Sequence, residues 1–378
     1  MILGSGQIAK NQPLLGQKEG KEVKKRFFAG KFRQGISLRD KIFFVQNLRI
    51  MIKGGLSLRA ALQTVAEQIS NKYFKEVIGN VWKEVESGVT FSQALEKYPK
   101  VFSDLFINMI KSGELSGNLE QVLERLHIQM KRDHDLISKV KGAMIYPAVV
   151  LIAMVGIGTA MIIFVVPKLI AIFEEFRAQL PLPTRILIGI SKFITGHGLI
   201  VAGGLFLFVF LFTKFYQSQS GKKFFHKLFL KLPVMANIVK KINLARFCRT
   251  TSSLLKTDIP IVQSLKITSL VVSNLYYRAA LVDASQKITK GLQINKVLSD
   301  YPKLFPPTVI QMLKVGEESG AVEEVLDEVA QFYEEDINQV METLPSIIEP
   351  ILILVLGLGV GGMAVAVIMP MYSLTQSF

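Results

Sequence analysis

The feature that most constrains this chain is a repeat at a fixed spacing. Residues 314–322, KVGEESGAV, match residues 111–119, KSGELSGNL, which lie 203 positions earlier. The match continues at the same spacing and without a gap over residues 44–167 and 247–370. Self-similarity at one spacing indicates a duplicated structural unit, so we expect two copies of one module.

Three apolar stretches predict that the chain crosses a membrane. Half of its residues are apolar and its mean hydropathy is +0.36, which is high for a soluble enzyme. Residues 143–166, 194–213 and 347–370 each approach the roughly 20 apolar residues that span a hydrocarbon core of about 30 Å. The middle stretch has Lys192 and His197 near its start, and a charge deep in lipid is costly, so its span is expected to begin after them. We therefore expect three transmembrane helices.

The rest of each copy has the periodicity of helices and no alternating strand pattern. Ser37 and Asp40 have the spacing of a capping box, which predicts the start of the first helix. Further capping residues, glycines and prolines divide residues 37–142 into about six helices, and residues 214–346 repeat the order. The predicted fold is all-α: an integral membrane protein with two repeated cytoplasmic helical bundles of about six helices each and three transmembrane helices.

Charge near the apolar stretches predicts the topology. Lysines and arginines gather before the first stretch and after the second, whereas the loop 167–193 mixes both signs. Positive flanks mark the cytoplasmic side, so both bundles are expected in the cytoplasm, with the loop and the tail 371–378 outside. The repeat agrees, because two copies that each end in an outward span need a middle span to return the chain. Residues 1–36 are basic and lack apolar periodicity, which predicts a flexible cytoplasmic tail.

No residue pattern indicates catalysis or a cofactor. The chain contains no GxxxxGK[ST] loop for a nucleotide and no serine in a GxSxG frame. His127 and His134 lie about 10 Å apart along one predicted helix, too far to share a metal ion as an i, i+4 pair would. The single cysteine, Cys248, excludes an intramolecular disulfide and fits a reducing compartment. We expect no enzymatic activity, cofactor, metal ion or nucleic-acid partner.

A glycine turn occupies the same place in both copies. Its first glycine is predicted to form a left-handed helix cap, and its serine to accept hydrogen bonds from free amides of the next helix. The turn comprises Gly113, Ser116 and Gly117 in the first copy and Gly316, Ser319 and Gly320 in the second. Glu114 and Glu317 are either structural residues or partner contacts, and their duplication favours the structural role. The carboxylate of Glu317, expected to be exposed, should add little to stability.

The second half of the chain divides its charge unevenly. Residues 176–257 contain no Asp or Glu, and residues 315–378 contain no Lys or Arg. One interpretation is a basic lipid-facing stretch followed by a solvated acidic helix face. The alternative is a docking surface for another protein.

Each copy also has a helix-weakening residue just before its membrane stretch. This residue is Gly142 in the first copy and Pro345 in the second. It is either a hinge or a kink that sets the angle at which the helix enters the membrane.

The repeated residues resemble a known family. Residues 43–62, FFVQNLRIMIKGGLSLRAAL, and 246–265, RFCRTTSSLLKTDIPIVQSL, are each followed by YPKxF and a GExSG turn. This pattern is similar to the type II secretion F family, the platform proteins of type IV pilus and type II secretion machines in the bacterial inner membrane. The resemblance covers nearly all of residues 37–370. The segment ahead of the first copy departs from the family, in which it is commonly longer and of different character.

The resemblance implies a multispan platform of the inner (plasma) membrane. Its implied partners are a cytoplasmic hexameric assembly ATPase, pilin or pseudopilin subunits, other inner-membrane assembly proteins, the lipid bilayer and further copies of itself. It implies a coupling role, in which motion of the ATPase drives insertion of pilin-like subunits into a fibre. The resemblance fits a pilus, a secretion and a DNA-uptake machine equally.

Two functions from other classes compete with the platform. A transporter subunit is disfavoured because three spans offer few polar residues to line a pathway. A membrane receptor is disfavoured because only a short loop and a tail are expected outside.

Overall fold

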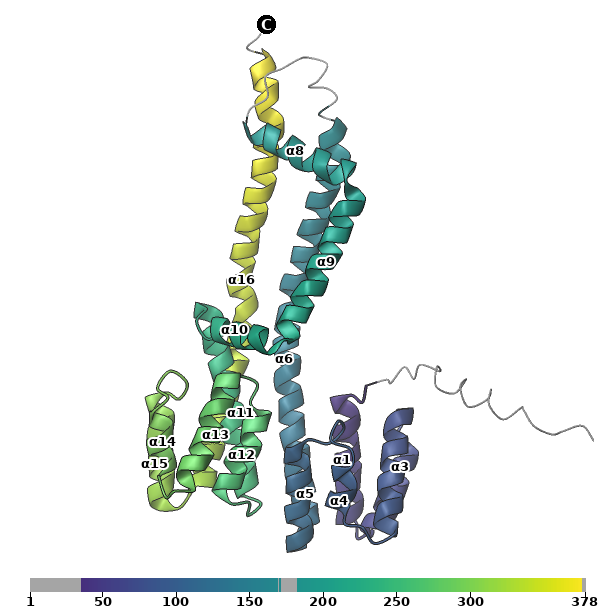
Figure 1. Cartoon of the computed structure of the whole chain (residues 1–378), viewed down its shortest axis with the longest axis vertical. Helices are drawn as coiled ribbons and strands as arrows, with labels where there is room; N and C mark the ends of the chain where they lie inside the picture. Colours follow the sequence, from purple (N-terminus) through teal and green to yellow (C-terminus); the bar gives the residue numbers. More distant parts are fainter. Residues whose placement is uncertain (1–34, 169, 171–181, 376–378) are drawn as a thin grey trace, which may run out of the picture.

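The computed structural model describes residues 35–168, 170 and 182–375, and every regular element in these ranges is a helix. Two helical bundles lie at one end, and long helices rise from them (Figure 1). This arrangement confirms the predicted all-α fold with two bundles. Most of the predicted tail 1–36, most of the predicted loop (residues 169 and 171–181) and residues 376–378 lie outside the described residues.

The first bundle consists of five helices and the start of a sixth. They are α1 (Leu38–Lys53), α2 (Leu58–Gln68), α3 (Lys72–Glu86), α4 (Phe91–Glu96), α5 (Asp104–Ser116) and α6 (Leu119–Ala160). The predicted capping box of Ser37 and Asp40 is present at the start of α1. Four more side chains each accept a hydrogen bond from a backbone N–H of the helix that follows: Ser57, Asn71, Thr90 and Ser103. Local capping therefore explains why the chain divides here into these helices.

The second bundle repeats this order. It contains α11 (Pro233–Leu255), α12 (Ile261–Val271), α13 (Leu275–Ile288), α14 (Ile294–Ser299), α15 (Pro307–Ser319) and the start of α16 (Val322–Thr375). Prolines occupy the first turn of α11 and α15, where the missing N–H costs no hydrogen bond. Six helices in each bundle agree with the prediction of about six.

The same three positions of the repeat hold an aromatic cluster in each core. In the first bundle, the ring centroids of Phe44 and Phe74 lie 5.7 Å apart, and both rings contact Phe102. Their counterparts in the second bundle lie 203 positions later, and Phe247 and Tyr277 each lie 5.4 Å from Phe305. The buried hydroxyl of Tyr277 donates to the Leu304 carbonyl at 2.6 Å, so the change from Phe to Tyr leaves no unpaired polar group.

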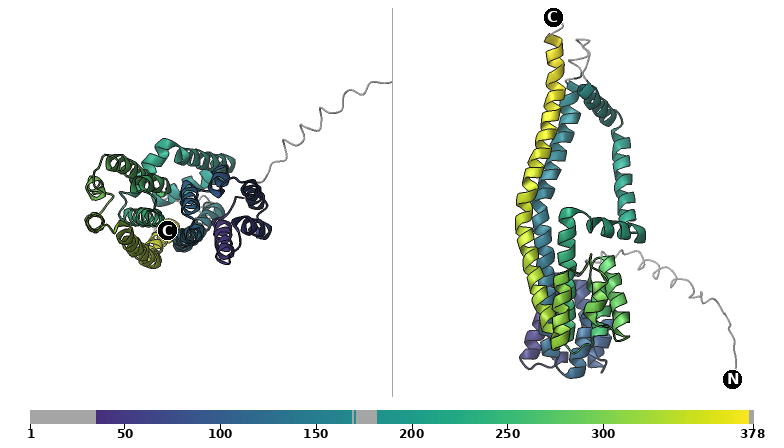
Figure 2. Two further views of the ribbon diagram at one scale, coloured as in Figure 1. Left: turned by 90° about the horizontal axis from the view of Figure 1, so that it is seen from below. Right: turned by 90° about the vertical axis from the view of Figure 1, so that its left-hand side faces the viewer.

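The last helix of each bundle continues without interruption into an apolar segment. Helix α6 passes through Gly142 and Pro147 and leads into the π-helix η1 (Met161–Val165), and α16 passes through Pro345. The 54 residues of α16 correspond to a rod of roughly 80 Å. The two long helices contact each other at the level of the bundles, where Arg132 pairs with Glu334, and their ribbons lie apart along the apolar segments (Figure 1 and Figure 2). Gly142 and Pro345 therefore do not break their helices in this structure.

In the described part of the connection between the two bundles, three further helices follow η1. They are α8 (Leu182–Gly196), α9 (Gly198–Gln217) and α10 (Gln219–Phe229). Within the part of the chain that the structure describes, three helices are long and apolar enough to cross a membrane, in residues 119–168, 198–217 and 322–369, which confirms the three predicted spans. Helix α8, which the sequence pattern does not predict, is anchored by two side chains: Thr184 donates to the Ala366 carbonyl at 2.6 Å, and Ser191 to the Ile162 carbonyl at 2.8 Å.

Candidate functional site

The two glycine turns lie where α5 meets α6 and where α15 meets α16. The left-handed residues are Gly117, with φ of 71°, and Gly320, with φ of 72°. The prediction that Gly113 and Gly316 take this conformation is wrong, because both helices continue for another turn and end at Ser116 and Ser319. The first glycine of each motif is a helical residue.

Close packing explains the glycines inside the helices. A methyl group at Gly113 would lie 2.9 Å from Cγ2 of Val122, and one at Gly316 would lie 3.1 Å from Cα of Val322. Both neighbours belong to the first turn of the long helix that follows. The absence of a side chain therefore lets α6 and α16 start directly against the preceding helix.

The two serines of the turns bond backward and not forward. The Ser116 hydroxyl donates to the Ser112 carbonyl at 2.9 Å, and the Ser319 hydroxyl donates to the Val315 carbonyl at 2.8 Å. The prediction that they accept from amides of the next helix is wrong. Because each serine lies in the last helical turn, the carbonyl four residues earlier is its nearest acceptor.

Glu114 and Glu317 tie each turn to a short helix of the same bundle. The Glu114 carboxylate accepts from the backbone N–H groups of Phe91 and Ser92 at 2.5 and 2.8 Å. The Glu317 carboxylate accepts from those of Ile294 and Asn295 at 2.6 and 3.0 Å. Each glutamate therefore caps the N-terminus of α4 or α14, where unpaired N–H groups and the helix dipole favour a negative charge.

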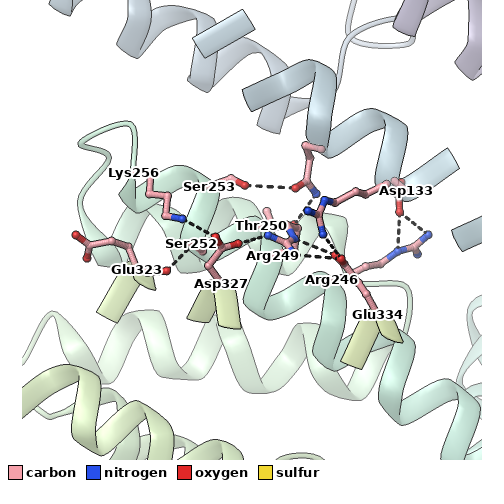
Figure 3. A network of polar contacts seen from close by, with 12 residues as sticks. Asp133, Arg246, Arg249, Thr250, Ser252, Ser253, Lys256, Glu323, Asp327 and Glu334 are labelled. Carbon is pink, nitrogen blue, oxygen red and sulfur yellow. Dashed lines mark hydrogen bonds and ion pairs between the residues drawn. The ribbon is translucent and has the colours of Figure 1, made fainter. Parts of the chain in front are cut away.

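A second set of polar residues lies between the two bundles, and we call it the seam. Its centre is Arg249 of α11, whose side chain is only 9% exposed. The guanidinium donates from Nε and Nη2 to Glu334 of α16 at 2.9 and 3.0 Å, and Nη1 contacts Asp327 of the same helix (Figure 3). This forked geometry is the strong form of an arginine–carboxylate pair. Lys256 also binds Asp327, at 2.7 Å.

Helix α6 of the first bundle joins the seam from the other side. Arg132 pairs with Glu334 at 2.5 Å, and Asp133 accepts from Arg246 of α11 at 3.0 Å. Gln129 lies one turn earlier on α6, and its side chain forms long hydrogen bonds with Thr250 and Ser253 of α11, each at 3.4 Å. Three helices, two of which continue into the membrane segments, are thus joined at one level of the molecule.

The seam also determines the ionisation of Asp327. Burial by itself raises the pKa of this carboxyl group. The hydrogen bond from Lys256 and the charges of Arg249, Lys256 and Arg132 outweigh burial, and the net pKa is lowered. Asp327 is therefore held as a carboxylate.

Further apolar and polar contacts, closer to the glycine turns, also connect the two bundles. Leu254, Ile259 and Ile267 of the second bundle pack into the core of the first. Ser112 of α5 donates to the Thr257 carbonyl at 2.5 Å, and Gln263 of α12 donates to Asn108 at 3.0 Å. The two bundles consequently pack as one body and do not hang separately from their spans.

The uneven charge of the sequence indicated the segments that contain the seam, but it did not identify the residues that form it. Part of the acidic stretch after residue 315 and part of the basic stretch before residue 257 neutralise each other inside the chain. The local signal was Arg249 itself, a charged residue next to the core residues Phe247 and Cys248, at a position where the first copy has Gln46. Among the described residues, no group of three or more His, Cys, Asp or Glu could hold a metal ion.

Comparison with known proteins matches both copies of the repeat. A family model described as "Type II secretion system (T2SS), protein F" matches residues 44–167 and 247–370. The type IV pilus assembly protein PilC of Myxococcus xanthus is 34% identical over 340 residues, which cover 90% of this chain and 81% of the relative. TapC, a type IV pilus assembly protein of Aeromonas hydrophila, is 34% identical and covers 91% and 84%. The type II secretion system protein F of Aeromonas hydrophila is 32% identical and covers 85% and 83%.

Proposed function

The chain belongs to the type II secretion system protein F family, and from this premise we propose that it is the inner-membrane platform of a type IV pilus or type II secretion machine. Members of this family are non-enzymatic parts of such machinery. The platform couples a cytoplasmic assembly ATPase to the insertion of pilin-like subunits, and it works as a homo-oligomer. Both bundles face the cytoplasm.

The observation that carries this proposal is the continuity of α6 and α16. Each helix starts at a glycine turn at the far end of its bundle and extends without interruption into an apolar segment (Figure 1). A force applied near Gly117 or Gly320 is transmitted along such a rod to the membrane. The seam joins both rods to α11, so a push on one bundle also moves the other.

The orientation rests on charge and on the placement of the bundles. Lys131, Arg132, Lys139 and Lys141 precede the first apolar segment, and positive flanks favour the cytoplasmic side. Both bundles lie at the same end of the long helices, and α9 returns the chain between them (Figure 1). This placement supports a topology in which both bundles lie on the same side of the membrane.

Site-specific crosslinking tests the coupling role. A photoreactive residue at Ser116 or Ser319, both exposed, is expected to capture the assembly ATPase in cells that assemble fibres. The same residue at Phe206, which is 74% exposed in the apolar helix α9, serves as the matched control and should capture lipid or membrane subunits. ATPase captured at Phe206, or at none of the three positions, would contradict the proposal.

Thiol labelling tests the orientation separately. The native Cys248 is completely buried, so a membrane-impermeant reagent reports only on an introduced cysteine. We expect Leu182→Cys, at the opposite end from the bundles, to react in cells whose outer envelope has been opened. Ser319→Cys should react only after the inner membrane is permeabilised. The reverse labelling pattern would show that the bundles lie on the opposite side of the membrane from the one proposed.

A further inference from the structure

Helix α10 leaves the end of α9 through a sharp turn. Ser218 ends α9 and caps α10: its hydroxyl oxygen accepts from the Gly221 N–H at 3.0 Å. A methyl group at Gly221 would lie 1.8 Å from the Phe215 carbonyl oxygen, so only glycine permits the turn. Helix α10 consequently runs across the lower end of α9 at a steep angle (Figure 2). If α9 spans the membrane, α10 lies along the membrane surface.

Apolar side chains occupy one side of α10. At 100° per residue, Phe224, Phe225, Leu228 and Phe229 share a face, and the lysines lie on the remaining surface. The Phe225 ring packs against Phe212 and Tyr216 of α9, with centroids 5.7 and 5.2 Å away. Phe224 is 56% exposed although it is large and apolar. The apolar face is therefore directed toward the end of the membrane span and is only partly covered by protein.

His226 attaches α10 to the second bundle. Its Nδ1 accepts from the Leu275 N–H at 3.1 Å, and its carbonyl accepts from the Asn274 side chain at 3.3 Å. Both partners lie at the N-terminus of α13. The helix is thus held between the bundle and the level at which α9 leaves the membrane.

The lysines of α10 have no acidic counterpart in the described structure. Lys222, Lys223 and Lys227 are exposed, and none forms an ion pair with a described residue. The sequence offers no Asp or Glu between residues 176 and 257. Uncompensated cations beside an exposed apolar face are typical of helices that lie in the interface of an anionic bilayer.

We propose that α10 lies in the plane of the inner membrane surface and binds the headgroups of anionic phospholipids through Lys222, Lys223 and Lys227. Phe224 enters the boundary between headgroups and acyl chains. An acidic protein would also attract the lysines, but exposed Phe224 beside the lipid-facing end of α9 favours the bilayer. Because His226 connects α10 to α13, this contact sets the distance of the second bundle from the membrane.

Depth-dependent quenching in nanodiscs tests where α10 lies. The full chain with Phe224→Cys carries a fluorophore at residue 224, since buried Cys248 does not react. Lipids with a quencher near the headgroup are expected to quench it strongly. The matched control is Glu318→Cys, an exposed position beside the Gly320 turn, which should not be quenched. Equal quenching at both positions, or none at residue 224, would overturn the in-plane placement.

Lipid selectivity tests the role of the lysines. The melting temperature of the full chain is expected to be higher in nanodiscs that contain phosphatidylglycerol than in phosphatidylcholine alone. Each lysine near an anionic surface strengthens binding about fivefold, so K222Q/K223Q/K227Q should lose most of this difference. The control K72Q/K83Q/K100Q removes three exposed lysines of the first bundle and should keep it. An unchanged lipid preference in the α10 variant, or the same stabilisation by free inorganic phosphate in phosphatidylcholine, would overturn the proposal.

Discussion

Arg249 of α11 and Glu334 of α16 are joined by two parallel hydrogen bonds of 2.9 and 3.0 Å, and Arg132 of α6 binds the same carboxylate at 2.5 Å. One glutamate on the second long helix thus connects it to the first long helix and to α11. Contacts of this kind hold the three helices together, because the spans themselves are largely exposed over their apolar windows.

Removing the centre of the seam should destabilise the chain. Arg249→Met leaves the partly buried Asp327 and Glu334 with Lys256 and Arg132 alone, so we expect a loss of about 2–3 kcal/mol in unfolding free energy. Lys314→Met is the matched control, because its pair with Glu318 is exposed on both sides, and it should change stability by less than about 0.5 kcal/mol. Denaturant unfolding of both variants in detergent checks this difference. Equal stability of the two variants would mean that the seam does not join the helices energetically.

Glu317 should matter for stability, contrary to the expectation from its place in a turn. Gln293 provides no capping side chain for α14, so Glu317→Ala leaves the first two N–H groups of this helix without their acceptor. We expect a loss of about 1–2 kcal/mol. Glu114→Ala should cost less, because Thr90 still caps α4. If Glu317→Ala lowers partner binding while the melting temperature stays at its wild-type value, the carboxylate is a partner contact instead.

The helical glycines and the left-handed glycines should respond to different substitutions. Gly316→Val places a side chain against the backbone of Val322, which cannot give way, and should cost about 2–3 kcal/mol. Gly320→Ala should cost about 1–2 kcal/mol, through its positive φ alone. Gly79→Ala is the control inside a helix with open space around it and should be neutral or stabilising. Thermal unfolding of the three variants separates steric from conformational cost.

Asp258 offers a stabilising change at a position where the repeat has diverged. It is the only non-glycine residue with positive φ among the described residues, at 60°, and its counterpart Gly55 has φ of 87°. Asp258→Gly should therefore raise stability by about 0.5–1 kcal/mol. The reverse change, Gly55→Asp, should lower it. A lower melting temperature for Asp258→Gly would show that the carboxylate contributes more than the backbone strain costs.

Acidification should weaken the attachment of α10 to the second bundle. Burial, together with the charges of Arg278 and Lys222, lowers the pKa of His226 below its ordinary value. The unfolded chain then binds the proton at higher pH than the folded chain. The stability contribution is complete above about pH 6.5 and is lost as pH falls toward the lowered pKa. His226→Gln should flatten this part of the stability profile, whereas His127→Gln, which removes another histidine of lowered pKa, should leave the His226 contribution in place.

The sequence by itself determined the repeat, the apolar spans and the helical character of each bundle. These properties depend on neighbours within a few positions: Ser37 caps with Asp40 three residues away, and a span needs only an uninterrupted apolar run. Even so, local reasoning placed the left-handed cap at Gly113 instead of Gly117. Either glycine can end a helix, and the close approach of Val122 to Gly113 decides between them.

Only the tertiary structure decided the roles of the charged residues. Glu317 reaches back 23 residues to Ile294, and Arg249 meets Glu334 across 85 residues. Such contacts depend on how helices pack, and neither periodicity nor charge counts specify that packing. The same acidic and basic stretches are equally compatible with charges that lie on a solvated surface. Packing of α6, α11 and α16 brings their charges within hydrogen-bond distance, where partial burial makes each unpaired charge costly and so selects one arrangement.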